Sequence, residues 1–134
     1  LLPAAIAYDE QRFGTRRGDL LVSLKDRAPQ LAHVVREAGG VKGFVLGREG
    51  RLAPQIGPLV ADDIGVARSL LGAALSQVEG ACIIDAADHH PKLRHSLQEF
   101  GFEPKRSFTR MLFARGEPFD DQNTILAIAG PEFA

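Results

Sequence analysis

Residues 56–71, IGPLVADDIGVARSLL, decide the fold of this chain. They read as an apolar strand, a short loop with Asp62, Asp63, Gly65 and Ala67, and then an amphipathic helix whose apolar residues recur at helical spacing. The free N–H groups of a first helical turn, together with the aligned peptide dipoles, favour a bound anion. The stretch therefore predicts an anion site of the phosphate-binding kind, although the two aspartates place negative charge beside it.

The composition is that of an ordinary globular domain. At 134 residues, with 45% hydrophobic and 25% charged residues, the chain is long enough for one domain with its own core. The net charge of −1 gives no reason to expect nucleic acid or an anionic membrane as a partner. A single cysteine cannot form an internal disulfide, and no segment resembles a signal peptide or a transmembrane span, so we expect a cytoplasmic protein.

Hydrophobic periodicity and turn residues predict an α/β order of elements along the chain. The first seventeen residues are expected to be irregular, with a linker or strand remnant over 1–7 and a polar turn over 8–17. Helices are expected over 19–26, 62–77 and 91–100. Strands are expected over 31–35, 41–47, 52–60, 81–86, 108–114 and 124–129.

The middle of the chain predicts a βαβ unit. A strand, a helix and a strand follow one another over residues 52–86, which predicts that strands 52–60 and 81–86 are parallel. Pro54 and Pro58 fall in the first of these strands, and because proline cannot donate to a ladder, that strand is expected to part from a neighbour. The second strand, ACIIDA, is nearly all apolar, as expected of a strand buried on both faces.

Short motifs spread along nearly the whole chain add a family resemblance. They are Phe13-Gly14 with Arg17, residues 43–46 with Arg48 and Gly50, Ile56-Gly57-Pro58, Asp85, Gly101-Phe102 and residues 108–111. In this order they resemble the GNAT superfamily of N-acetyltransferases, and most closely a subgroup in which a divergent GNAT-like domain follows a standard one. Since the chain also begins at Leu1 rather than methionine, we expect residues 1–134 to be a single GNAT-like domain, the C-terminal domain of a longer protein.

The resemblance implies a fold, a reaction and partners. The fold is a mixed α/β sheet, with an antiparallel meander, a βαβ crossover and antiparallel C-terminal strands, flanked by helices. The reaction is transfer of acetyl from acetyl-CoA to an amine of a small molecule or peptide. Family members bind the cofactor at a splayed strand and the loop after it, which implies contacts at Leu59, Val60, Gly65 and Ala67. The implied partners are a preceding GNAT domain of the same chain and a second copy in a homodimer.

Two departures from the family pattern affect the expected activity. Asp62 stands where the family loop has a basic or amide residue, and two unit charges about 4 Å apart interact by roughly 4 kcal/mol at an effective dielectric constant near 20. The alternative is that Asp62 or Asp63 simply caps the following helix. Leu97 stands where the family often has a tyrosine acid, and the only tyrosine is Tyr8.

These departures make us expect weak or absent acetyl-CoA binding by this chain alone, and they leave the catalytic acid and base unidentified. They also keep a second function open. In that reading the domain is a non-catalytic, GNAT-like binding module that completes a substrate cleft or a dimer interface.

Arg110 is the most informative charge outside the loop. It lies in an apolar stretch next to Met111, and strand alternation places it on the same face as Phe108. Because a buried arginine needs a partner, it either forms an internal ion pair, for which Asp85 is the candidate, or anchors an anionic group in a cleft. Both readings stay open.

The remaining polar groups favour structural roles. Residues 88–90 (Asp-His-His) together with His95 match no standard metal-ligand spacing, so we expect helix capping and no metal site. Arg16 and Arg17 are expected to be a solvated pair. Cys82 falls in the apolar strand and is expected to be a buried, inert thiol.

Overall fold

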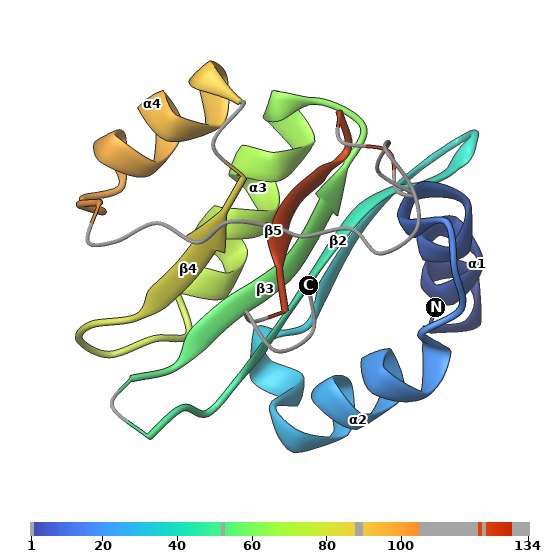
Figure 1. Cartoon of the computed structure of the whole chain (residues 1–134), viewed down its shortest axis with the longest axis horizontal. Helices are drawn as coiled ribbons and strands as arrows, with labels where there is room; N and C mark the ends of the chain where they lie inside the picture. The colour runs from blue at the N-terminus through green and yellow to red at the C-terminus, as the bar shows by residue number, and fades with distance from the viewer. Residues whose placement is uncertain (1, 52, 88–89, 105–120, 122, 130–134) are drawn as a thin grey trace, which may run out of the picture.

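The computed structural model describes residues 2–51, 53–87, 90–104, 121 and 123–129, and within them five strands form one mixed sheet with helices on both faces (Figure 1). The helices are α1 (Leu2–Phe13), α2 (Gly18–Arg27), α3 (Ile64–Leu75) and α4 (Pro91–Glu99), with a 3₁₀ turn at Pro29–Leu31. The strands are β1 (His33–Glu37), β2 (Gly40–Arg48), β3 (Gln55–Ala61), β4 (Ile83–Ala86) and β5 (Ile125–Ile128).

Strand β3 is the centre of the sheet. It pairs antiparallel with β2, which pairs antiparallel with β1, so the first three strands form the predicted meander. On its other edge β3 pairs parallel with β4, but only at Gln55↔Ile83 and Ile56↔Ile84. This confirms the predicted parallel pair joined by α3.

Pro58 marks an interruption of the sheet, whereas Pro54 lies just before β3 rather than within it. Between the pairs Gly47↔Ile56 and Val45↔Leu59, two residues of β3 face one residue of β2, and Pro58 is one of the two. Such a bulge tolerates a residue that cannot donate to the ladder. Beyond Ile56, β3 also parts from β4. The expectation that this strand leaves a neighbour is therefore confirmed.

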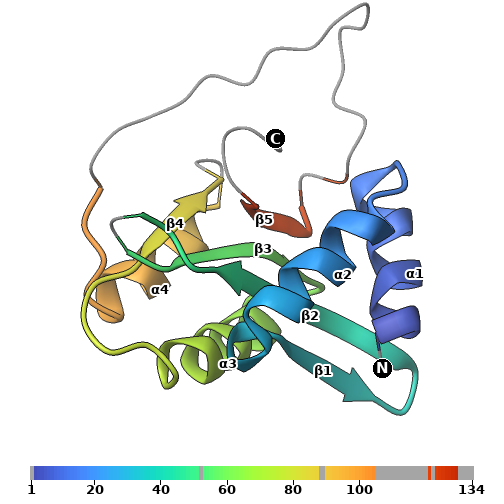
Figure 2. The ribbon, with the colours of Figure 1, turned by 90° about the horizontal axis from the view of Figure 1, so that it is seen from below.

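The helices cover the two faces of the sheet separately (Figure 2). α3 and α4 bury leucines such as Leu70, Leu71 and Leu93 against one face, whereas α1 and α2 bury Tyr8 and Leu21 against the other. The five leucine and tyrosine side chains are each at most 5% exposed. Full burial of one such leucine contributes about 1.5–3 kcal/mol, so these two layers account for much of the stability of the fold.

The expectation of an irregular N-terminus was wrong, because residues 2–13 form the helix α1. Its buried residues are Ala5, Tyr8, Asp9 and Phe13. Steps of three or four residues lead from Ala5 to Tyr8 and Asp9 and from Asp9 to Phe13, so these residues lie on one helix face. One of these positions is an aspartate, which breaks the apolar stripe that periodicity would need. The helix ends before Gly14, whose φ of 87° suits a glycine after a helix.

Other boundaries moved less. The first strand begins at His33 rather than at residue 31, because Pro29–Leu31 forms a 3₁₀ turn after the end of α2. β4 was expected to be buried on both faces, and this was wrong, since Ile83 is 43% exposed and Ala86 is exposed. α2, α4 and β5 lie within a few residues of their predicted ranges. The predicted strand over 108–114 lies outside the described residues.

Candidate functional site

The loop between β3 and α3 is shaped by Asp63. This residue is the N-cap of α3, and its Oδ1 accepts a hydrogen bond of 2.9 Å from the N–H of Val66. Its carbonyl oxygen accepts a bond of 3.1 Å from the N–H of Ala67. The capping alternative is therefore confirmed for Asp63. Of the two predicted cofactor contacts in this loop, Gly65 is exposed, whereas Ala67 is fully buried in the core.

Asp62 faces the opposite way and meets two residues of α1. The Tyr8 hydroxyl donates a hydrogen bond of 2.8 Å to Asp62 Oδ1 and also lies 3.0 Å from the carbonyl oxygen of Lys42. Arg12 Nη2 forms an ion pair of 3.2 Å with the same carboxylate oxygen, and its guanidinium stacks 3.9 Å from the Tyr8 ring centroid. Because Arg12 offsets the charge of Asp62, the expected repulsion of a phosphate is smaller than the sequence indicated.

These contacts also define what Tyr8 can do. Burial of the phenol is the main cause that raises its pKa well above the usual value, and the nearby Asp62 carboxylate raises it further. A raised pKa makes the phenol a weaker acid, and its proton is already donated to Asp62 Oδ1. Tyr8 therefore fastens α1 to the loop after β3.

Tyr8 provides a direct test of this contact, because the chain has one tyrosine and no tryptophan. The folded-state pKa is raised, so the neutral phenol stabilises the fold below the ordinary pKa of about 10 and this contribution is lost as the pH rises further. We expect the ultraviolet absorbance of tyrosinate to appear at a higher pH in the native protein than in urea. Equal titration midpoints in the two states would contradict the buried Tyr8–Asp62 contact, and Tyr8→Phe supplies the blank.

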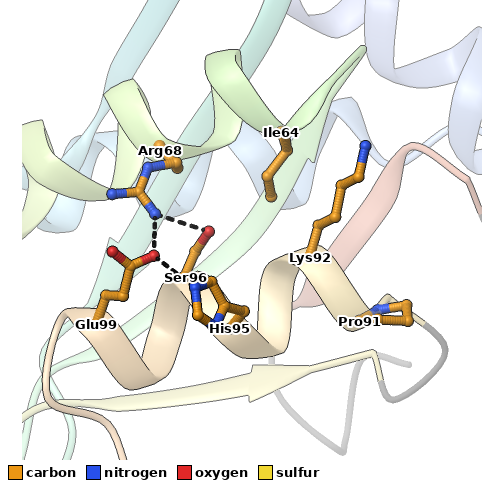
Figure 3. A pocket seen from close by; sticks show the side chains of 7 residues that line it. All are labelled: Ile64, Arg68, Pro91, Lys92, His95, Ser96 and Glu99. Carbon is orange, nitrogen blue, oxygen red and sulfur yellow. Dashed lines mark hydrogen bonds and ion pairs between the residues drawn. The ribbon is translucent and has the colours of Figure 1, made fainter.

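A second feature is a groove of about 370 Å³ between α3 and α4 (Figure 3). It is lined by Ile64, Arg68, Pro91, Lys92, His95, Ser96 and Glu99. α3 follows β3 and α4 follows β4, and since these strands are parallel, both helices begin at the same end of the sheet. The partial positive charges of the two helix N-termini therefore lie near the same end of the groove.

The groove carries a cationic side chain at each end. Arg68 Nη1 donates hydrogen bonds of 3.0 Å to Ser96 Oγ and to Glu99 Oε1, and His95 Nε2 lies 3.3 Å from the same Glu99 oxygen (Figure 3). Lys92 stands at the other end, next to the first turn of α3. Glu99 offsets the charge of Arg68, so the groove keeps the positive charge of Lys92 beside two helix N-termini, which suits an anionic ligand such as a phosphate. Sequence reasoning missed this groove, because its residues come from separate helices and share no local motif.

A third feature is the region where β3 and β4 part. β5 lies between them, pairing with β3 at Leu59↔Ala127 and Val60↔Ile125 and with β4 at Asp85↔Ile128 and Ala86↔Ala127 (Figure 1). Leu59 and Val60, the two predicted cofactor contacts on the splayed strand, are both 0% exposed. The predicted strand contacts are thus buried next to β5, whereas the predicted loop contact Gly65 is exposed.

Asp85, one half of the predicted Arg110–Asp85 pair, has a different partner in the described part of the chain. Gln55 Nε2 donates a hydrogen bond of 2.5 Å to Asp85 Oδ2, and Arg48 Nη2 donates one of 3.1 Å to Gln55 Oε1. This polar chain crosses β2, β3 and β4. Arg110 lies outside the described residues, so its pairing with Asp85 or with a ligand stays a prediction.

Other candidate residues have structural environments. Leu97, at the position of the family's tyrosine, is buried in the core. Cys82 lies just before β4 and is half-buried, so the expectation of a buried thiol within the strand was wrong. This partial burial raises the pKa of the thiol and so disfavours the reactive thiolate. Within the described residues, no group of three or more histidine, cysteine or carboxylate side chains could hold a metal ion.

The same part of the chain contains no helix that is both long and apolar enough to cross a bilayer.

The expectation of a solvated Arg16–Arg17 pair was right for the first residue and wrong for the second. The side chain of Arg16 is 91% exposed. Arg17 is 8% exposed and forms a two-pronged ion pair with Asp9, in which Nε donates a bond of 2.8 Å and Nη2 one of 2.7 Å. Its guanidinium also stacks 3.7 Å from the ring centroid of Phe13. Arg17 therefore holds the turn between α1 and α2 against α1 and has little contact with solvent.

Comparison with known proteins agrees with this fold. A structure of a point variant of TTHA1254 from Thermus thermophilus superposes with a TM-score of 0.58 at 19% sequence identity, covering 85% of this chain and 92% of that one. At this identity the likeness concerns the fold alone. No curated protein matches the chain. The family model described as "Acetyltransferase (GNAT) domain" matches residues 5–127. Because the match covers most of the chain, the chain belongs to the GNAT acetyltransferase family.

Proposed function

We propose that this chain is a domain of an N-acetyltransferase, an enzyme that transfers acetyl from acetyl-CoA to an amine, and that its part is to hold the phosphate end of the cofactor in the groove between α3 and α4. The observation that carries the proposal is the meeting of two helix N-termini with Lys92 at one end of a groove that also holds Arg68, paired with Glu99. Coenzyme A carries several phosphates at its nucleotide end, and such groups bind at helix N-termini and at basic side chains.

The chemistry of transfer is assigned to a different part of the enzyme. Leu97 cannot donate a proton, and the hydroxyl proton of Tyr8 is engaged in a hydrogen bond to Asp62 Oδ1. We therefore propose that a preceding GNAT domain of the same chain, in the cytoplasm, carries the acetyl transfer to a small-molecule or peptide amine. In this arrangement the present domain contributes binding, and it also offers a surface for a homodimer.

A second candidate function is a non-catalytic module that completes a substrate cleft or a dimer interface. The position of β5 between β3 and β4 favours it, because the splayed strand that the family uses for the cofactor is already paired. The two candidates differ in one measurable property, which is whether this chain binds coenzyme A at all.

Calorimetric titration of the chain with coenzyme A separates them. We expect a dissociation constant of roughly 0.1–1 mM, as the exposed groove offers electrostatic contacts and little apolar burial. A low-micromolar constant, about −8 kcal/mol, would contradict the expectation of weak binding. Absence of any binding would contradict the role of the groove and favour the second candidate. Turnover of acetyl-CoA by the longer polypeptide, assayed with small amines and peptides, tests the transfer itself.

Lys92→Gln is expected to weaken coenzyme A binding roughly threefold to fivefold, because it removes one exposed cation from the anion groove. The effect should shrink as the salt concentration rises. Lys25→Gln is the matched control, since it makes the same change of charge in α2, which packs on the other face of the sheet. Equal losses of affinity in the two variants would mean that only net charge matters and would count against a site in the groove.

A further inference from the structure

The wedge between β3 and β4 has the geometry that the family uses for the acyl arm of the cofactor. Here "wedge" means the space that opens beyond Ile56 and Ile84, the last directly paired residues of the two strands. Its open end lies at the end of the sheet where α3 and α4 begin. A cofactor with its phosphates at these helix N-termini would have its arm near this wedge.

The chain itself fills the wedge with β5 (Figure 1). The backbone N–H of Ala61, at the end of β3, donates a hydrogen bond of 3.0 Å to the carbonyl oxygen of Thr124. The N–H of Ala87, just beyond β4, donates one of 2.8 Å to the carbonyl oxygen of Leu126. β5 therefore uses backbone groups on the inner edges of both strands.

The side chains of β5 are buried in the two hydrophobic clusters of the core. Ile125 is 4% exposed in the cluster under α1 and α2, whereas Leu126 at 5% and Ala127 at 0% belong to the cluster under α3 and α4. Near Ile128 the strands approach so closely that a Cβ atom on Gly57 would overlap the Ile128 carbonyl oxygen. This contact leaves no room for a further extended chain between β3 and β5.

We propose that β5 excludes the acyl arm of acetyl-CoA from this domain, so that the groove takes the phosphate-bearing nucleotide and the wedge takes nothing. The inference rests on the proposed role of the groove. An extended arm with amide groups would bind a strand edge by backbone hydrogen bonds, and it needs that edge to be free. Here the arm would first have to remove a strand that pairs on both edges and contributes to both cores.

The consequence is that the arm adds no affinity. Calorimetry of the full chain with adenosine 3′,5′-bisphosphate, coenzyme A, acetyl-CoA and pantetheine tests this directly. We expect the first three ligands to bind within about threefold of one another and pantetheine to show no saturation. Binding of acetyl-CoA more than about tenfold tighter than that of the bisphosphate would overturn the exclusion. Failure of all four ligands to bind would overturn the groove, and with it the cofactor part of the proposed function.

Amide hydrogen exchange on the unmodified chain supplies an independent readout. The N–H groups of Ala61 and Ala87 report on β5, whereas the N–H of Asp62, which donates a bond of 2.9 Å to the Lys42 carbonyl oxygen, reports on the β2 side of the same strand end. We expect saturating acetyl-CoA to leave the protection of all three unchanged. A loss of protection at Ala61 and Ala87 beyond about tenfold, with Asp62 unaffected, would show that the arm displaces β5 and would overturn the proposal.

Discussion

Asp9→Ala is expected to lower the free energy of unfolding by about 3–5 kcal/mol, because it leaves the guanidinium of Arg17 buried without its counter-charge. The side chains of Asp9 and Arg17 are 1% and 8% exposed, and two parallel hydrogen bonds of 2.7 and 2.8 Å join them. Water cannot hydrate the guanidinium in place of the lost carboxylate unless α1 and the start of α2 move apart. In a thermal melt the change corresponds to a fall in Tm of roughly 10–20 °C for a domain of this size.

Two further variants separate this explanation from a general loss of charge. Glu10→Ala removes the neighbouring carboxylate, whose partner Arg16 is 91% exposed, and it should change stability by less than about 1 kcal/mol. The double variant Asp9→Leu with Arg17→Met removes both charges and should recover most of the loss, since replacing a whole buried pair with apolar residues is often neutral. A double variant no more stable than Asp9→Ala would show that packing, rather than the unpaired charge, causes the loss.

The same ion pair explains why the N-terminus was the least predictable part of the fold. Asp9 occupies a buried position of α1, so hydrophobic periodicity could not show the helix. Its partner Arg17 lies beyond Gly14, where the chain turns from α1 into α2. The two charges meet only after that turn has formed, and a reading of local pattern therefore treats each of them as a solvated residue.

The βαβ unit could be predicted because its signals are local. The apolar run of β3, the cap at Asp63 and the helical spacing of α3 lie next to one another in the chain. A right-handed crossover then leaves few arrangements other than a parallel pair of β3 and β4. Pro58 likewise predicted that this strand parts from a neighbour, since a proline in a central strand interrupts the ladder.

The candidate site could be predicted only in part, because most of it arises from tertiary contacts. The loop after β3 is visible in the sequence, but Arg68 and Lys92 meet only when α3 and α4 lie side by side. The place of β5 was equally hidden. The apolar pattern of residues 124–129 is the same for a strand at the edge of a sheet and for a strand between two earlier strands. The order of strands depends on the whole fold and so cannot be predicted from this local pattern.

Gly57→Ala is expected to lower the free energy of unfolding by roughly 3 kcal/mol or more, because it combines backbone strain with overpacking. Gly57 has a φ of 146°, a conformation that residues with a side chain rarely adopt. Its new Cβ would also overlap the carbonyl oxygen of Ile128 in β5, and a backbone atom cannot move aside as a flexible side chain can. Urea unfolding measures the loss, and hydrogen exchange at Ala61 shows whether β5 has loosened.

Gly72→Ala is the matched control, since it makes the same chemical change within α3, where a Cβ would meet nothing within 4 Å. It should raise stability by about 0.5–1 kcal/mol, because alanine loses less conformational freedom than glycine when a helix forms. If the close approach of β5 to β3 is correct, the two substitutions have effects of opposite sign. A Gly57→Ala variant with stability and Ala61 exchange equal to the parent chain would mean that β5 does not lie against β3, and the exclusion of the acyl arm would fail with it.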